Sequence, residues 1–144
     1  AWCLFYYVRN KWHIKILLNF IKNAAELKDF QILKVSILNY FNALIEDERK
    51  ARFVLETEVL DAIKSDNLAR FFFDSLIIFL KESINLEFNI SYYLKTHETL
   101  LKNLYNKIRN IDNSIFSISE LKNNLDLNIN KTLLLEQTHN ILKR

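Results

Sequence analysis

The sequence of 144 residues contains no glycine, no proline and no methionine. Without glycine and proline, the chain lacks the residues that usually form tight turns and hairpins. The absence of glycine also excludes glycine-rich phosphate loops and dinucleotide-binding fingerprints. Apolar and polar residues alternate only briefly, whereas apolar residues spaced by three and four recur along the chain. This pattern predicts an all-helical protein.

Cysteine and long apolar runs are equally scarce. The one cysteine, Cys3, excludes an internal disulfide framework and favours a reducing compartment. No apolar run approaches the roughly 20 residues of a membrane span. A composition of 50% hydrophobic and 26% charged residues is typical of one folded domain. We therefore expect a single all-helical domain over 1–144, located inside the cell in the cytoplasm or nucleus.

One sequence motif occurs three times with substitutions. LETEVLDAI at 55–63 returns as LKTHETLLKNL at 94–104 and as LEQTHNILK at 135–143. The threonines of the three copies lie at positions 57, 96 and 138, so the spacing is 39 and then 42 residues. A spacing near forty in a helical chain is typical of repeat proteins, in which stacked units bury their apolar faces against one another.

The apolar spacing also predicts where helices begin and end. Phe30, Leu33 and Ile37 start a pattern of threes and fours that predicts a long helix over 29–46. A charged break over 46–50 follows. The rest of this unit is predicted as a short helix over 53–55, a corner at Thr57-Glu58 with Thr57 as helix cap, and a third helix over 59–63, ended by residues 64–67.

The same order returns further along the chain. The second unit is predicted as a long helix over 68–81, a short helix over 90–94, a corner at Thr96-His97 and a helix over 99–108. A third, incomplete unit has a helix over 115–121 capped by 112–114, a corner at Thr138-His139, and short elements at 132–135 and 141–142.

This order of a long helix, a short helix, a corner and another helix resembles the armadillo repeat and, more broadly, the HEAT repeat. The resemblance covers about 30–144 and implies a right-handed α-solenoid whose long helices line a concave groove. The repeat-like units are then about 1–28 (degenerate), 29–65, 66–110 and 111–144 (incomplete), within a fragment of a longer solenoid. The glycine and proline that this family carries near its corners are absent, which leaves a HEAT-like or irregular helical array open. A compact helical bundle is the alternative fold.

No catalytic motif is present, so we expect a protein that is not an enzyme, with no catalytic residue, cofactor or metal. Glu58, His97 and His139 occupy equivalent repeat positions, which raises the question of a metal or acid–base site. Stacked helices lie about 10 Å apart, so one residue from each repeat does not converge on a metal ion. We therefore expect these three side chains to face solvent at the corners.

Phe71, Phe72 and Phe73 are three successive aromatic residues in the second long helix. A helix cannot direct three successive side chains at a single core stripe. Packing against neighbours on both sides of the helix is the favoured interpretation. The alternative is an exposed ring that anchors another protein.

The function predicted from these patterns is a non-enzymatic protein-binding scaffold or adaptor that acts with protein partners in a larger complex. The candidate partner-binding residues are Lys34, Asn39, Asn42, Phe73, Asp74, Lys81 and Glu82. One alternative is a helical-bundle surface or secreted binding domain. Another is a nucleic-acid-binding module that uses Lys102, Lys107, Arg109 and Lys122 with Tyr105. Nucleic acid is the less favoured partner, because acidic residues are interspersed and the net charge is only +3.

Overall fold

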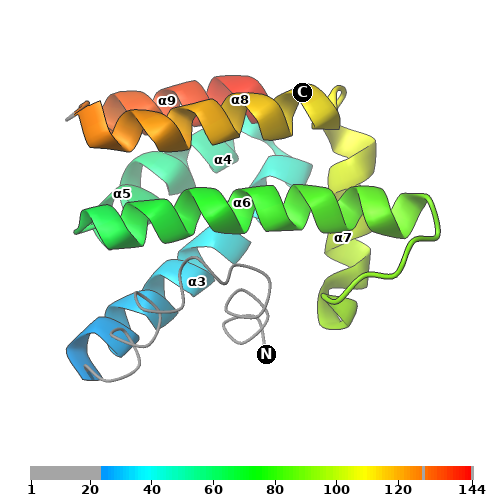
Figure 1. Ribbon diagram of the computed structural model, residues 1–144, viewed down its shortest axis with the longest axis horizontal. Helices are drawn as coiled ribbons and strands as arrows, with labels where there is room; N and C mark the ends of the chain where they lie inside the picture. Colours follow the sequence, from blue (N-terminus) through cyan, green and yellow to red (C-terminus); the bar gives the residue numbers. More distant parts are fainter. Residues whose placement is uncertain (1–23, 128, 144) are drawn as a thin grey trace.

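The computed structural model describes residues 24–127 and 129–143, and every regular element in them is helical (Figure 1). The prediction of an all-α protein is confirmed for this part of the chain. The predicted degenerate unit over 1–28 and the single cysteine, Cys3, fall wholly or mostly outside the described residues. No helix among the described residues is both long enough and apolar enough to cross a membrane.

Helix α3 (Ala24–Glu46) contains the predicted long helix over 29–46. Its apolar stripe is fully buried: Phe30, Leu33 and Ile37 are each at most 1% exposed. The helix ends where Asp47 takes an extended backbone and accepts a hydrogen bond from the Arg49 N–H at 3.0 Å. An aspartate in this conformation starts a new helix, so the predicted charged break separates two helices.

The first predicted corner is absent. Helices α4 (Glu48–Val54), η2 (Leu55–Val59) and α5 (Leu60–Ala62) follow one another without interruption, η2 being a single π-helical turn. The Thr57 hydroxyl donates to the Phe53 carbonyl at 2.7 Å and caps nothing. The prediction of a corner at Thr57-Glu58 is therefore wrong. A threonine that bonds back to the preceding turn lets a helix continue, and no glycine is present to end it.

Helix α6 (Asp66–Glu87) begins at Ser65, whose hydroxyl accepts from the Leu68 N–H at 3.3 Å. It lies between α3 on one side and α8 on the other (Figure 1). The Phe71 ring packs on Phe30 of α3 with 4.0 Å between ring centroids. All three rings of 71–73 are buried, with at most 2% exposed. This confirms packing on more than one side of the helix.

The connection after α6 is not helical, so the predicted helix over 90–94 is wrong. Asn89 has a positive φ of 56°, a conformation that asparagine tolerates and that ends a helix. The Glu82 carboxylate accepts from the Tyr93 N–H at 2.8 Å and holds this connection against α6. The chain then forms η3 (Lys95–His97) and α7 (Glu98–Lys107), so a turn at Thr96-His97 does precede a helix.

The last helices are longer than predicted. Helix α8 (Ile111–Asn123) starts before the predicted cap at 112–114, and Ser114 donates to the Asn110 carbonyl from within it at 3.0 Å. After η4 (Asn124–Leu127), α9 (Lys131–Leu142) is one helix instead of two short elements. The Thr138 hydroxyl donates to the Leu134 carbonyl at 2.8 Å, so the predicted corner at Thr138-His139 is also wrong.

The helices pack in layers, with α6 running through the middle of the view in Figure 1. Helices α8 and α9 lie side by side above α6, α3 lies below it, and α7 crosses one end. Helix α9 also contacts η2 and α5. The Tyr40 hydroxyl of α3 lies 3.3 Å from His139 Nδ1 of α9. Elements of the predicted unit over 29–65 therefore touch elements of the unit over 111–144.

Candidate interaction groove

A groove of about 510 Å³ lies between α3 and α7, and we refer to it as the α3–α7 groove. Its position follows from the contact of α3 with α7 at the end of the molecule where α7 crosses (Figure 1). Positions 38, 42 and 45 of α3 fall on one helical stripe, which forms one wall. The lining residues are Leu38, Asn42, Ile45, Glu46, Thr96, His97, Thr99, Leu100 and Asn103.

The groove combines an apolar floor with polar walls. Leu38 and Ile45 are partly buried and Leu100 is buried, whereas the Asn42 and Asn103 side chains are exposed. Asparagine amides offer both hydrogen-bond donors and acceptors, which suits the backbone of a bound peptide segment. Apolar side chains beneath such amides provide the contact area that binding sites require.

His97 lies at the groove with part of its ring buried. Its ring packs on Phe79 of α6 with 5.7 Å between centroids. Burial lowers the pKa of the His97 imidazole, and the positive charge of Lys34 lowers that pKa further. The ring is therefore neutral at neutral pH and presents one donor and one acceptor.

The candidates on α3 fall in or near the groove. Asn42 lines it, and Lys34 is close enough to act on the His97 charge. Asn39 is exposed and donates from its amide to the Glu58 carboxylate at 3.0 Å, which directs it towards η2. Lys81 is exposed on α6 and is not among the groove residues.

Three candidates on α6 lie in the interior. Phe73 is 1%, Asp74 5% and Glu82 0% exposed. Asp74 forms an ion pair with Lys122 of α8, and Glu82 accepts from the Tyr93 backbone. Because these parts of α6 are covered, Asp74 and Glu82 serve contacts within the chain and do not line the α3–α7 groove.

The equivalent repeat positions do not form a column of solvent-facing residues. Glu58 is exposed as expected, but His97 is partly buried and His139 is only 4% exposed. The expectation that His139 faces solvent is wrong, because its segment is a helix packed on η2 and not a corner. In the described part of the chain, no group of three or more His, Cys, Asp or Glu side chains could hold a metal ion.

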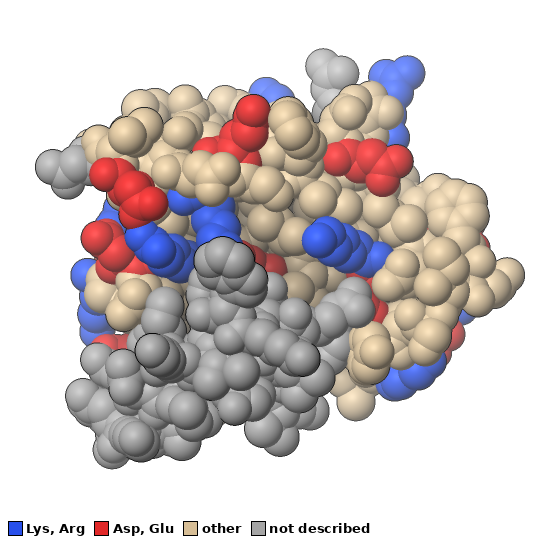
Figure 2. Space-filling model, viewed as in Figure 1, with Lys and Arg blue, Asp and Glu red and all other residues tan. Residues whose placement is uncertain are grey.

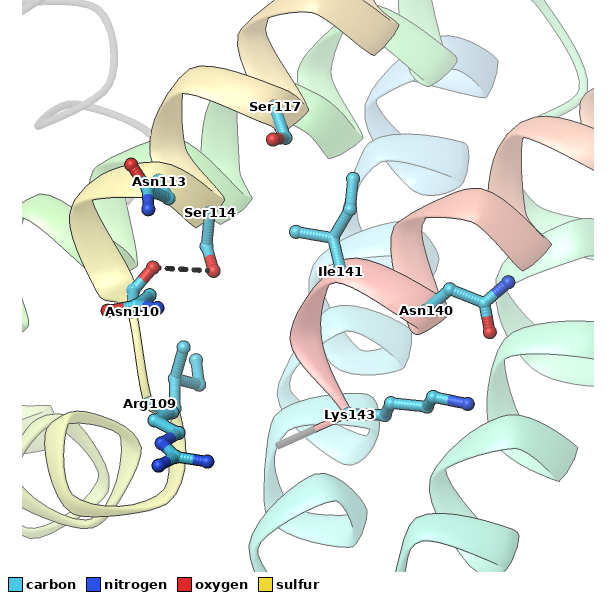
Figure 3. Close-up of a pocket in the computed structure, with 9 residues that line it drawn as sticks. Arg109, Asn110, Asn113, Ser114, Ser117, Asn140, Ile141 and Lys143 are labelled. Carbon is cyan, nitrogen blue, oxygen red and sulfur yellow. Dashed lines mark hydrogen bonds between the residues drawn. The ribbon is translucent and has the colours of Figure 1, made fainter.

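A second hollow, of about 320 Å³, lies between the start of α8 and the end of α9 (Figure 3). The Ile141 side chain projects towards α8, where Ser114 donates to the Asn110 carbonyl. Lys143 extends away from the α8 side chains, and the Arg109 head lies well apart from it. The two cations do not converge, so this hollow is a weaker candidate for an anionic ligand.

The basic residues proposed for nucleic acid are partly neutralised. Lys102 pairs with Glu98 at 3.3 Å, and Lys122 pairs with the buried Asp74. Figure 2 shows acidic and basic side chains next to one another on the described part of the face that is drawn. Paired charges of both signs give a weak net field, unlike the basic patch that nucleic acid requires.

Sequence reasoning missed most of the groove. Leu38 and Ile45 belong to the apolar pattern of α3 and are indistinguishable there from core residues. Leu100 and Asn103 sit on a helix that the sequence predicted, but their contact with α3 depends on the path of the connection over 88–94. The available signal was the stripe at positions 38, 42 and 45, where an asparagine interrupts apolar residues.

Comparison with protein-family models, curated proteins and solved structures finds no match for this chain. The resemblance to armadillo and HEAT repeats therefore stays a prediction. The chain's own geometry is the basis for assigning a function.

Proposed function

We propose that this chain is a non-enzymatic protein-binding module that holds a segment of another protein in the α3–α7 groove. The observation that carries the proposal is the groove itself, with an apolar floor between two asparagine-bearing walls. Peptide recognition on helical surfaces uses the same combination, with apolar anchors for affinity and polar groups for orientation.

The surface of α3 extends the groove beyond its lining residues. Val35 lies one turn before Leu38 on the same helical stripe and is 57% exposed. A bound segment that follows α3 from Ile45 to Val35 covers apolar surface along about three turns. This length supports a short peptide or a helix as the bound element.

The adaptor role predicted from the sequence is thus assigned to a different set of residues. Among the candidates predicted from the sequence, Asn42 lines the groove. Lys34 lies close enough to the groove for its charge to lower the pKa of His97. The buried residues of α6 take no part in the proposal. Their role is indirect: they hold α6 in place, and the His97 ring at the groove packs on Phe79 of α6.

We also propose that the helices form a closed bundle in place of the predicted solenoid. In a solenoid each repeat contacts only its neighbours. Here the predicted unit over 29–65 contacts the unit over 111–144, which is not its neighbour, through Tyr40 with His139 and through Arg52 with Glu136 at 3.4 Å. These contacts support the compact bundle, which was the alternative to an armadillo/HEAT-like array.

The groove is tested by an asparagine pair on α7. Asn103 lines the groove, whereas Asn106 is exposed on the same helix outside the lining. We expect Asn103→Arg to weaken partner binding at least about tenfold, the effect of losing about 1.4 kcal/mol in a binding site, and Asn106→Arg to leave it unchanged. The measurement is affinity capture from the source lysate after nuclease treatment, followed by titration of the recovered partner.

Two results contradict the proposal. Equal binding by the wild type and by both variants removes the groove from the binding surface. Recovery that disappears with nuclease transfers the function to nucleic acid and to the basic residues around Lys107. Circular dichroism of each variant verifies that the helices are intact.

A further inference from the structure

His139 is a buried histidine linked to a distant helix. Its ring is 4% exposed, and its Nδ1 lies 3.3 Å from the hydroxyl of Tyr40, which is fully buried on α3. Burial raises the pKa of the Tyr40 phenol, which therefore keeps its proton. We assign the neutral imidazole the tautomer with its hydrogen on Nε2, so the phenol O–H donates to Nδ1 and this hydrogen bond joins α9 to α3.

The other ring nitrogen has no such bond. His139 Nε2 is buried and has no hydrogen-bond partner among the described residues. A cavity of about 170 Å³ adjoins the ring and is lined by Arg52, Leu55, Glu56, Glu136, His139 and Asn140. Arg52 pairs with Glu56 at 2.9 Å and with Glu136 at 3.4 Å, so Arg52 already engages both carboxylates of the cavity.

Protonation changes the charge and the hydrogen-bonding groups of the His139 ring. Protonation adds a hydrogen to Nδ1, so the Tyr40 phenol can no longer donate to that nitrogen and the ring gains a full charge in a buried place. The Nε2–H has no acceptor among the described residues in either form. Burial is the main reason that the pKa of His139 is lowered. Around the ring, Glu48 and Glu56 favour the charged form, and Arg52 and Lys143 oppose it.

We propose that His139 is an acid-sensitive latch: the neutral ring holds α9 against α3 and η2, and protonation releases α9. Released α9 exposes the apolar face of Leu134, Leu135 and Leu142, which are at most 2% exposed in the docked helix. Acid then presents an interaction surface that the closed bundle hides. This device is separate from the α3–α7 groove, which shares none of its residues.

The direction of the pH effect follows from the lowered pKa of His139 in the folded chain. Released α9 lets the ring take its ordinary pKa of about 6.5, so docking is fully stabilised above that pH. As pH falls below about 6.5 and through the folded pKa, the released state binds the proton better. The docked state loses about tenfold in population for each pKa unit by which docking lowers the pKa of the ring.

Hydrogen exchange of α9 amides tests the latch in the whole chain. Between about pH 7.5 and about pH 5.0, the protection factors of α9 should fall relative to those of α6 in the wild type. His139→Gln removes the titrating ring and should abolish this fall. His97→Gln is the matched control and should keep the wild-type response. The proposal fails if the protection of α9 is independent of pH in the wild type. It also fails if α9 of His139→Gln loses as much protection between the two pH values as α9 of the wild type.

A second variant covers the case in which His139→Gln does not fold. Tyr40→Phe keeps the ring and removes the hydroxyl that donates to Nδ1 of the neutral form. Loss of that bond should raise the pKa of His139, seen as an upward shift of its titration midpoint by NMR, and should release α9 at higher pH. An unchanged or lowered midpoint contradicts the latch.

Discussion

At the residue scale, two aspartates form ion pairs that differ in burial. Asp74 of α6 pairs with Lys122 of α8, and its side chain is 7% exposed. Asp126 of η4 pairs with Arg70 of α6, and its side chain is 69% exposed. A charge left behind in the interior is costly, whereas an exposed pair in water contributes little.

We expect Lys122→Ala to lower the free energy of unfolding by about 3 kcal/mol, because it leaves the buried Asp74 carboxylate without the Lys122 ammonium. Asp126→Ala should change it by less than about 1 kcal/mol. Urea denaturation monitored by circular dichroism measures both. Similar values for the two variants would show that burial does not distinguish these pairs.

The sequence located Asp74 as a polar residue of a long helix but misjudged its surroundings. One amphipathic pattern cannot reveal that a helix is covered on several sides, as α6 is. The same limit applies to Glu82 and Phe73. By contrast, Asn42 is exposed as its place in the pattern of threes and fours predicts, because α3 keeps one exposed face.

At the scale of elements, the hydroxyls of Ser65 and Thr57 have different roles. Ser65 accepts from the Leu68 N–H and caps α6, whereas Thr57 donates to the Phe53 carbonyl in the middle of a helical segment. The sequence predicted a cap at Thr57, where the structure has none. Both positions tolerate alanine sterically, so the two substitutions can be compared directly.

Ser65→Ala should lower the free energy of unfolding by about 1 kcal/mol, the usual effect of losing an N-cap. Thr57→Ala should leave the stability within about 0.5 kcal/mol of wild type, because alanine has the higher helix propensity and no cap is lost. Thermal and urea denaturation measure both effects. If Thr57→Ala lowered the free energy of unfolding by about 1 kcal/mol, the result would support the cap and corner predicted at Thr57.

The elements themselves were largely predictable, and their joints were not. Long helices at 29–46 and 68–81 follow from the spacing of large apolar residues, and both are present as parts of α3 and α6. The three copies of the repeated motif differ in structure, because Thr57 and Thr138 lie within helices and Thr96 lies in a turn. Without glycine or proline, nothing local marks which copy must turn.

At the scale of the whole molecule, the contacts of α9 with η2 and α5 bring the last described helix back to the first part of the fold. If the helices form the proposed compact bundle, a chain of 144 residues has a radius of gyration of about 15 Å. Small-angle X-ray scattering of the monomer should give that value with a compact distance distribution.

A solenoid gives a different scattering curve. Its units extend in one direction, so its radius of gyration is several ångströms larger and its distance distribution has a long tail. That result would restore the linear array predicted from the repeat spacing and would contradict the contact between α3 and α9. The Arg52→Ala variant lacks the exposed ion pair with Glu136. It should give the same radius of gyration as the wild type, because an exposed pair contributes little to stability.

The hydrogen bond between Tyr40 and His139 also has a consequence for biosynthesis. Its two partners are 99 residues apart, so the ribosome has made nearly the whole described chain before they can meet. Until then, α3 and η2 emerge with the surface that α9 covers still open to water and to other nascent chains. Completion of this part of the core must therefore follow synthesis of α9, which ends at Leu142.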